Sequence, residues 1–285
     1  MPMTQQDIRS HYETEWKSTS EAAGDVTGLN YSNAIEDAVL YPAYEQLLGD
    51  LNITVSGGRV LDVGSGSGRW IRFFLERWRP ALLMGIDYTA ASIELLRKWH
   101  AAADTPVEFR LADITREGLD LGGTFDLVNV ANVLFHIPEP ELFAQALVNL
   151  TSLIDRQGSI VTTEYLPRCP MRTEWMMVRS RYQFEAACAA AGLRIAGIRA
   201  FSFFANTPMG LDGPDEGMRR HFNTVRAGVD QLLASQLNEQ SRRFLIGLFG
   251  EIELAAVGFA RERIADLDLP GQKLVVLKRA GNASK

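Results

Sequence analysis

The chain has 285 residues, of which 46% are hydrophobic and 22% charged, and this is the composition of a soluble globular protein. Its formal net charge of −6 argues against a nucleic-acid partner, because phosphate binding needs clustered Lys and Arg side chains. No apolar run is long enough for a membrane span, and the first 20 residues lack the apolar core of a signal peptide, so we expect a cytoplasmic protein.

Two helical patterns open the chain. Residues 5–17 place Ile8, Tyr12 and Trp16 on one face, and a second pattern runs from residues 32–33 to about residue 51. The aromatic side chains here, with Tyr31 between the two patterns, have two interpretations. They pack the helices onto the rest of the protein, or they form a lid over a binding site.

The strongest motif is Val-Leu-Asp-Val-Gly-Ser-Gly-Ser-Gly-Arg-Trp, at residues 60–70. It joins a short apolar run, a glycine loop and the start of an amphipathic pattern, which predicts a strand, a tight turn and a helix, the first unit of a βαβ fold. Glycines let a ligand approach the backbone without meeting a Cβ, and the following helix turns its first N–H groups toward that ligand. The dinucleotide pattern Gly-x-Gly-x-x-Gly fits in neither register, because its third glycine would fall on Ser67 or Ile71.

The loop instead reads Asp-x-Gly-x-Gly-x-Gly, with Asp62 two residues before the first glycine. It resembles the first motif of the class I S-adenosylmethionine (SAM) methyltransferases, and the resemblance extends over about residues 60–204. An acid beside the loop suits SAM, which carries an ammonium group and no phosphate. The resemblance implies SAM as the cofactor and a cofactor site formed by Asp62, Gly64, Ser65, Gly66, Gly68, Asp87, Tyr88, Asp113, Ile114, Asn129 and Val130.

Two of these acids follow the next two predicted strands. Residues 81–86 form a buried strand that ends in Asp87, nineteen positions after Gly68, where an acid suits the ribose hydroxyls of SAM and NAD alike. Residues 107–111 form the third strand. The resemblance implies that Asp113 then accepts a hydrogen bond from the adenine amino group.

The fourth predicted strand, residues 125–133, ends where open α/β sheets bind ligands. It lacks the Asn/Asp-Pro-Pro-Tyr/Phe motif of methyltransferases that act on nucleic-acid bases. His136 follows, and its ordinary pKa of about 6.5 suits a general base for a hydroxyl, although it could also only hold the loop. Glu164 and Tyr165, at the end of the fifth strand, are alternative bases. No spacing typical of metal ligands is present, so we expect no metal.

A long insertion precedes the last strand. Residues 205–271 carry two apolar helical stripes, within 222–233 and 244–256, and we predict a helical insertion that either caps the substrate or pairs two copies as a homodimer. The fold class is therefore α/β: a Rossmann-like sheet of seven strands, the sixth at 194–204 and the last, antiparallel one at 273–278. The predicted parts are an N-terminal helical lid (1–55), a SAM-binding core (56–204), the insertion (205–271) and the last strand with its tail (272–285).

Methyl transfer from SAM is an in-line displacement, so the protein chiefly aligns the reactants. The residues predict an enzyme, a SAM-dependent methyltransferase acting on a hydroxyl of a small molecule or of a sugar in a glycan. Loose motifs at 132–137, 179–182 and 203–208 resemble a branch of the family with such acceptors. The alternatives are an N- or C-methyltransferase of a natural product and a non-catalytic SAM-binding protein; the three acids Asp62, Asp87 and Asp113 argue against the last. The sequence does not identify the acceptor.

Overall fold

The computed structural model describes residues 3–22, 31–100, 107–203, 205–206, 209–213 and 215–281, without the side chains of residues 19–22 and 31–33. These residues form a seven-stranded sheet in the order β3-β2-β1-β4-β5-β9-β8, in which β9 is antiparallel to both neighbours and the remaining pairs are parallel. The predicted α/β fold with an antiparallel last strand is confirmed. The strands are β1 (Arg59–Val63), β2 (Leu82–Asp87), β3 (Val107–Leu111), β4 (Phe125–Val130), β5 (Ile154–Glu164), β8 (Leu193–Ala200) and β9 (Lys273–Arg279), and a separate small hairpin pairs β6 (Met171–Arg172) with β7 (Met177–Val178).

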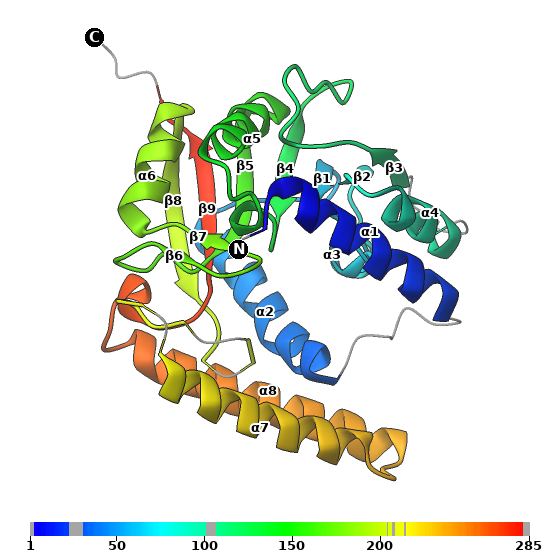
Figure 1. The fold of residues 1–285 in the computed structure, drawn as a ribbon, viewed down its shortest axis with the longest axis vertical. Coiled ribbons are helices and arrows are strands. Elements are labelled where there is room, and N and C mark those ends of the chain that lie inside the picture. Colours follow the sequence, from blue (N-terminus) through cyan, green and yellow to red (C-terminus); the bar gives the residue numbers. More distant parts are fainter. Residues whose placement is uncertain are drawn as a thin grey trace.

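Helices cover both faces of the sheet (Figure 1). One apolar cluster joins the sheet to α2, α3, α4 and α8, and the other joins it to α5 and α6. None of the described helices is long and apolar enough to cross a membrane. The helices are α1 (Gln5–Ala22), α2 (Tyr31–Asp50), α3 (Arg69–Arg77), α4 (Ala90–Trp99), α5 (Pro140–Leu153), α6 (Arg181–Ala190), α7 (Glu216–Ala234) and α8 (Glu239–Arg261), with short 3-10 turns η1 (Leu134–His136) and η2 (Asp266–Asp268).

The two N-terminal helices have different surroundings. Side chains of α2 such as Val39, Leu40 and Tyr44 are completely buried in the core. Helix α1 instead crosses the sheet beside α4, as Figure 1 shows. Helix α2 is thus part of the packed core, and the N-terminal lid over residues 1–55 stays a prediction.

Two strands end earlier than predicted. The fourth strand stops at Val130, and Asn132 then takes a left-handed conformation with φ +58°, which no strand residue adopts. The sixth strand stops at Ala200. Beyond it, the backbone N–H groups of Phe203 and Ala205 donate to Glu253 of α8 and so leave the sheet.

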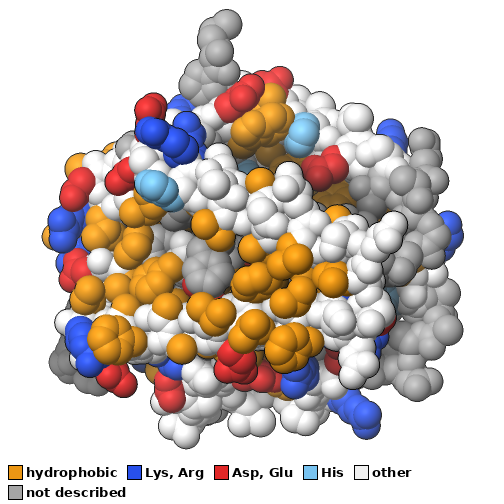
Figure 2. Space-filling view, turned by 90° about the horizontal axis from the view of Figure 1, so that it is seen from below, with side chains coloured by type: hydrophobic (Ala, Val, Ile, Leu, Met, Phe, Trp, Pro, Cys, Tyr) orange, Lys and Arg blue, Asp and Glu red, His pale blue; other side chains and the backbone are white. Residues whose placement is uncertain are grey.

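The insertion is a helical hairpin, α7 and α8, that packs along α2 at one end of the molecule (Figure 1). Gly250 allows the close approach, since a Cβ there would lie 2.9 Å from the Cβ of Ala38. Within the single chain, the second apolar stripe is only partly covered. Phe244, Leu248 and Ile252 are exposed, and Figure 2 shows hydrophobic side chains gathered on this face.

Candidate functional site

A cavity of about 430 Å³ lies at the carboxyl ends of the parallel strands. The segments after β1, β2, β3, β4 and β5 all contribute to its wall, which is where ligands bind in open α/β sheets. Helix α1 adds Tyr12 and Trp16, and the insertion adds Asn206 and Arg226. The cavity is therefore enclosed by the core, the first helix and the insertion together.

The glycine loop is packed too closely for any side chain. A Cβ at Gly64 would lie 2.5 Å from Val133, and one at Gly66 would lie 2.9 Å from the ring of Trp16. Both residues also have positive φ, +71° and +50°, which favours glycine. The loop thus exposes bare backbone to the cavity, and this cradle fits a ligand that lies flat against the chain.

Asp62 and Asn129 pair behind this loop. Asn129 Nδ2 donates to Asp62 Oδ1 at 2.7 Å, and the hydroxyl of Tyr44 donates to Asn129 Oδ1 at 3.3 Å. Burial raises the pKa of Asp62 to about 7, against the opposing effect of its hydrogen bonds. Its second oxygen, Oδ2, is buried and has no hydrogen-bond partner among the described residues. A positively charged group near this carboxylate would stabilise it, as the ammonium group of SAM would, although Asp62 itself lies behind the loop and does not line the cavity.

Asp87 links the glycine loop to the end of β2 by a hydrogen bond. Its carboxylate accepts hydrogen bonds from the backbone N–H of Gly66 (3.0 Å) and from the backbone N–H and hydroxyl of Thr89 (2.9 and 2.6 Å). Burial raises the pKa of Asp87, and these hydrogen bonds oppose the rise. Asp87 also lines the cavity, and a carboxylate has about four lone-pair sites, so it retains capacity for a ribose hydroxyl.

Asp113 connects the other end of the cavity to α1. Its Oδ1 accepts hydrogen bonds from the backbone and the hydroxyl of Thr115, at 2.9 and 2.7 Å. Its Oδ2 lies 3.7 Å from Arg9 of α1, whose guanidinium also lies over the ring of Tyr88. The first helix therefore reaches the residues that are predicted to hold adenine.

His136 is held between a backbone carbonyl and a phenol. Its Nδ1 lies 2.9 Å from the carbonyl oxygen of Trp175, and its Nε2 lies 3.3 Å from the hydroxyl of Tyr12. Because a carbonyl only accepts, Nδ1 carries the proton and Nε2 is the acceptor. Burial lowers the pKa of His136 and raises that of Tyr12 to about 12, so both side chains are neutral near pH 7.

The structure brings most of the predicted site residues together. The predicted residues that line the cavity are Tyr12, Trp16, Gly64, Ser65, Gly66, Asp87, Tyr88, Asp113, Ile114, His136 and Tyr165. Those that do not line it are Asp62, Gly68, Asn129, Val130 and Glu164. The side chain of Tyr31 lies outside the described residues.

Gly68 is the N-cap of α3, and its φ of +78° ends the glycine loop. Glu164 is fully buried and accepts a hydrogen bond from Thr162 at 3.2 Å, and burial raises its pKa to about 8. Because Glu164 does not line the cavity, His136 is better placed than Glu164. Tyr165 does line the cavity, but burial raises its pKa above the ordinary value, which makes its phenolate a less accessible base than the neutral imidazole of His136.

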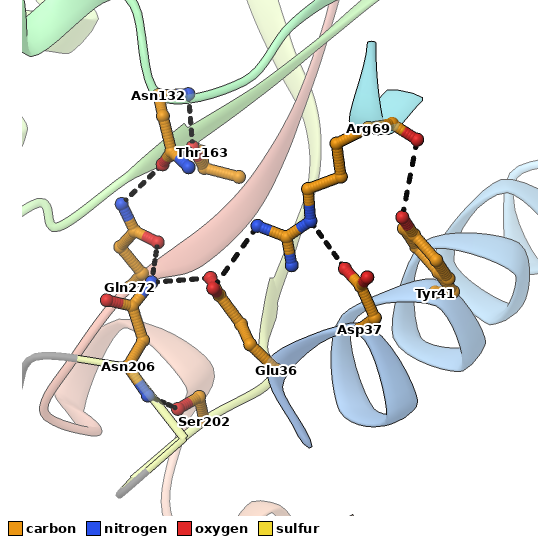
Figure 3. A network of polar contacts seen from close by, with 9 residues as sticks. All are labelled: Glu36, Asp37, Tyr41, Arg69, Asn132, Thr163, Ser202, Asn206 and Gln272. Atoms are coloured by element: carbon orange, nitrogen blue, oxygen red, sulfur yellow. Dashed lines mark hydrogen bonds and ion pairs between the residues drawn. The ribbon is translucent and has the colours of Figure 1, made fainter. Parts of the chain in front are cut away.

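The sequence did not indicate a polar wall of the cavity, shown in part in Figure 3. Arg69 Nη1 lies 3.2 Å from Glu36, and its Nε pairs with Asp37. Burial raises the pKa of Glu36. Arg69 directly follows the glycine loop, and Asn132 and Asn206 lie in the loose motifs at 132–137 and 203–208, but none of these signals predicted that the side chains meet. The wall consists of Glu36, Arg69, Asn132, Asn206, Arg226 and Gln272.

Comparisons with known proteins agree with this geometry. Residues 60–158 match the family model for a methyltransferase domain. The ubiquinone biosynthesis O-methyltransferase of Neisseria meningitidis serogroup C is 28% identical over 171 residues, 54% of this chain and 71% of that protein. The enzyme of the same name from Chromobacterium violaceum is 29% identical over 101 residues, 35% of this chain and only 43% of that protein.

Among solved structures, the [4+2]-cyclase SpnF has a TM-score of 0.54 at 17% identity, with 99% of this chain and 98% of SpnF covered. At that identity the likeness concerns the fold alone. The matched residues 60–158 contain the glycine loop, Asp87 and Asp113, which the structure gathers around one cavity. With the sequence match, the sheet order and the site in agreement, residues 60–158 form a methyltransferase domain within a class I fold, and the cofactor is S-adenosylmethionine.

Proposed function

We propose that this enzyme methylates a hydroxyl group of a small molecule. The observation that supports the proposal best is the state of His136: a buried, neutral imidazole whose accepting atom, Nε2, faces Tyr12 in the cavity. A hydroxyl must lose its proton as it attacks a methyl group, and a neutral imidazole is suited to take it. The curated relatives named O-methyltransferases support the same kind of acceptor.

Each part of the cavity then has a task. When bound, SAM supplies a methyl group that its sulfonium already activates. The glycine loop and Asp87 hold the nucleoside, and α1 covers the cavity and excludes water. The acceptor hydroxyl takes the place of the Tyr12 hydroxyl at Nε2 of His136 and gives up its proton there. The carbonyl of Trp175 fixes the ring orientation and stabilises the imidazolium that forms.

Methyl transfer from isotope-labelled SAM to a panel of phenols, sugars and amines tests the proposal. We expect product with at least one hydroxyl acceptor and a large loss of turnover in His136→Asn. Transfer to amines alone, undiminished in that variant, would instead support N-methylation, because an amine that binds neutral needs no base. A sugar acceptor, a homodimer and a cytoplasmic location stay predictions.

A further inference from the structure

In the polar wall of the cavity, the hydrogen bonds determine which way each side-chain amide is turned, that is, where its oxygen and its nitrogen lie. We infer that Asn132 presents an N–H donor to the methyl acceptor and so selects acceptors that carry a carbonyl-type oxygen (a ketone, ester, amide or carboxylate) in addition to the reacting hydroxyl. The inference rests on the proposed function, since it takes this side of the cavity as the place of the acceptor. It follows from the hydrogen bonds in Figure 3.

Glu36 determines the orientation of the first amide, that of Asn206. Its Oε2 accepts from Arg69 Nη1 at 3.2 Å, and its Oε1 lies 2.8 Å from the side-chain amide of Asn206. Although burial raises the pKa of Glu36, the charges of Arg69 and Arg226 oppose this effect and favour the carboxylate, which only accepts hydrogen bonds. The atom of Asn206 that faces Glu36 is therefore its nitrogen, Nδ2.

The orientation of Asn206 in turn determines the orientations of two further amides, those of Gln272 and Asn132. Asn206 Nδ2 also lies 2.6 Å from Gln272, so the facing atom of Gln272 is its oxygen, Oε1. The other amide atom of Gln272, Nε2, then donates to Asn132 at 2.9 Å, which must accept with its oxygen, Oδ1. Since an amide has one oxygen and one nitrogen, each orientation determines the next.

Thr163 gives the same orientation independently. Its hydroxyl oxygen accepts from the backbone N–H of Asn132 at 2.8 Å and lies 2.8 Å from Asn132 Oδ1. The single hydroxyl proton is therefore donated to Oδ1. Two donors, Gln272 Nε2 and the Thr163 hydroxyl, thus bind the side-chain oxygen of Asn132 and hold it in the wall.

The nitrogen of the same amide, Nδ2, makes no hydrogen bond with the described residues, and Asn132 lines the cavity. Its left-handed backbone, φ +58°, is a conformation that Asn tolerates better than most residues and that is concentrated at functional sites. The wall therefore offers a donor at Asn132, while His136 offers an acceptor four residues later. A second hydroxyl on the acceptor would need a partner for its own proton, whereas a carbonyl oxygen needs only the donor.

A matched pair of probes tests the inference: 3-hydroxyacetophenone and 3-ethylphenol, which has a CH₂ where the ketone has its carbonyl. Binding of each to the protein loaded with S-adenosylhomocysteine is measured by calorimetry, which needs no turnover. One hydrogen bond corresponds to about a three- to tenfold preference for the ketone in the wild type. Asn132→Asp replaces the donor by an acceptor in the same shape and keeps a residue that tolerates positive φ. We expect it to weaken ketone binding at least about tenfold and to leave 3-ethylphenol within twofold.

The double variant Thr163→Val, Gln272→Met removes both donors to Asn132 Oδ1 and frees the amide to turn. We expect its preference for the ketone to fall to near one while both probes still bind. An unchanged preference in this variant or in Asn132→Asp overturns the inference, as does a wild type that binds neither probe at millimolar concentration. A wild type that prefers the ketone but methylates no hydroxyl refutes the proposed function alone. One that methylates hydroxyls and binds both probes equally refutes this inference alone.

Discussion

The hydroxyl of Tyr12 lies 3.3 Å from Nε2 of His136, although the two residues belong to the first helix and to the turn after β4. The ring of Tyr12 stacks on Trp16, which rests on Gly66 of the glycine loop. One face of α1 thus connects the proposed base to the glycine loop that is predicted to hold the cofactor. The neutral state of the base depends on this burial, and its orientation depends on Trp175 and Tyr12.

The role of His136 can be separated from its place in the structure. In His136→Asn, the amide nitrogen can replace Nδ1 as the donor to the Trp175 carbonyl, but no base remains. We expect kcat to fall by about 10²–10⁴ with SAM affinity unchanged, as measured by steady-state kinetics and calorimetry. His136→Gln should not restore turnover. Activity within threefold of wild type in both variants would mean that alignment alone carries the reaction.

The lowered pKa of His136 has two consequences for pH dependence. Turnover should be constant at neutral pH and fall only below about pH 6.5, because the base stays neutral down to a pKa under the ordinary value. The free energy of unfolding should also decrease as pH falls below about 6.5, since the unfolded chain then takes up a proton that the folded protein refuses. Denaturant titrations between pH 5 and 8 measure the second effect. The part due to His136 should be absent in His136→Asn.

Loss of the Asp87 carboxylate should weaken cofactor binding. Asp87→Ala removes a charged acceptor for the ribose and the partner of the Gly66 N–H, so we expect the Kd for SAM to rise about 10- to 100-fold, equivalent to about 1.5–3 kcal/mol. Asp120→Ala is a matched control, because Asp120 accepts a backbone hydrogen bond from Gly122 in an exposed turn. Calorimetry that finds equal SAM affinity in Asp87→Ala and wild type would remove Asp87 from the site.

Gly66 should be coupled energetically to Trp16. In Gly66→Ala the new Cβ would lie 2.9 Å from the indole, at a φ of +50°. We expect weaker SAM binding and a lower Tm, with part of the loss recovered in the double variant that adds Trp16→Ala. Gly118→Ala measures the backbone strain alone, because φ is +70° there and no atom lies within 4 Å of the new Cβ. A coupling free energy under about 0.5 kcal/mol would show that α1 does not press on the loop.

The insertion should affect the acceptor and not the cofactor. Arg226 of α7 lines the polar side of the cavity, whereas Arg219, two turns earlier in the same helix, is exposed and does not line the cavity. We expect Arg226→Met to raise the KM for the acceptor several-fold and to leave the Kd for SAM within twofold. Arg219→Met should change neither. A raised Kd for SAM with an unchanged acceptor KM would contradict the assignment of the insertion to substrate choice.

The sequence predicted those parts of the site that come from a single segment. The glycine loop and the acids after β2 and β3 follow directly on apolar strands, and all lie at one edge of the sheet. The polar wall was not predictable, because Glu36, Asn206 and Gln272 come from three distant segments that only packing brings together. Periodicity identifies the apolar face of a helix but not the element that it meets. The sequence therefore predicted one N-terminal lid, without separating α2, which packs in the core, from α1.

The two contacts of α1 at opposite ends of the cavity also have a kinetic meaning. Arg9 pairs with Asp113 beside the adenine end, and Tyr12 bonds His136 beside the reaction centre, so one rigid helix spans both ligands. If α1 is the predicted lid, spent cofactor and methylated product leave once α1 lifts and the Arg9–Asp113 contact breaks, since the acceptor has by then already replaced Tyr12 at His136. On that expectation, the opening rate of a single helix, rather than the speed of methyl transfer, would set the residence time of the products.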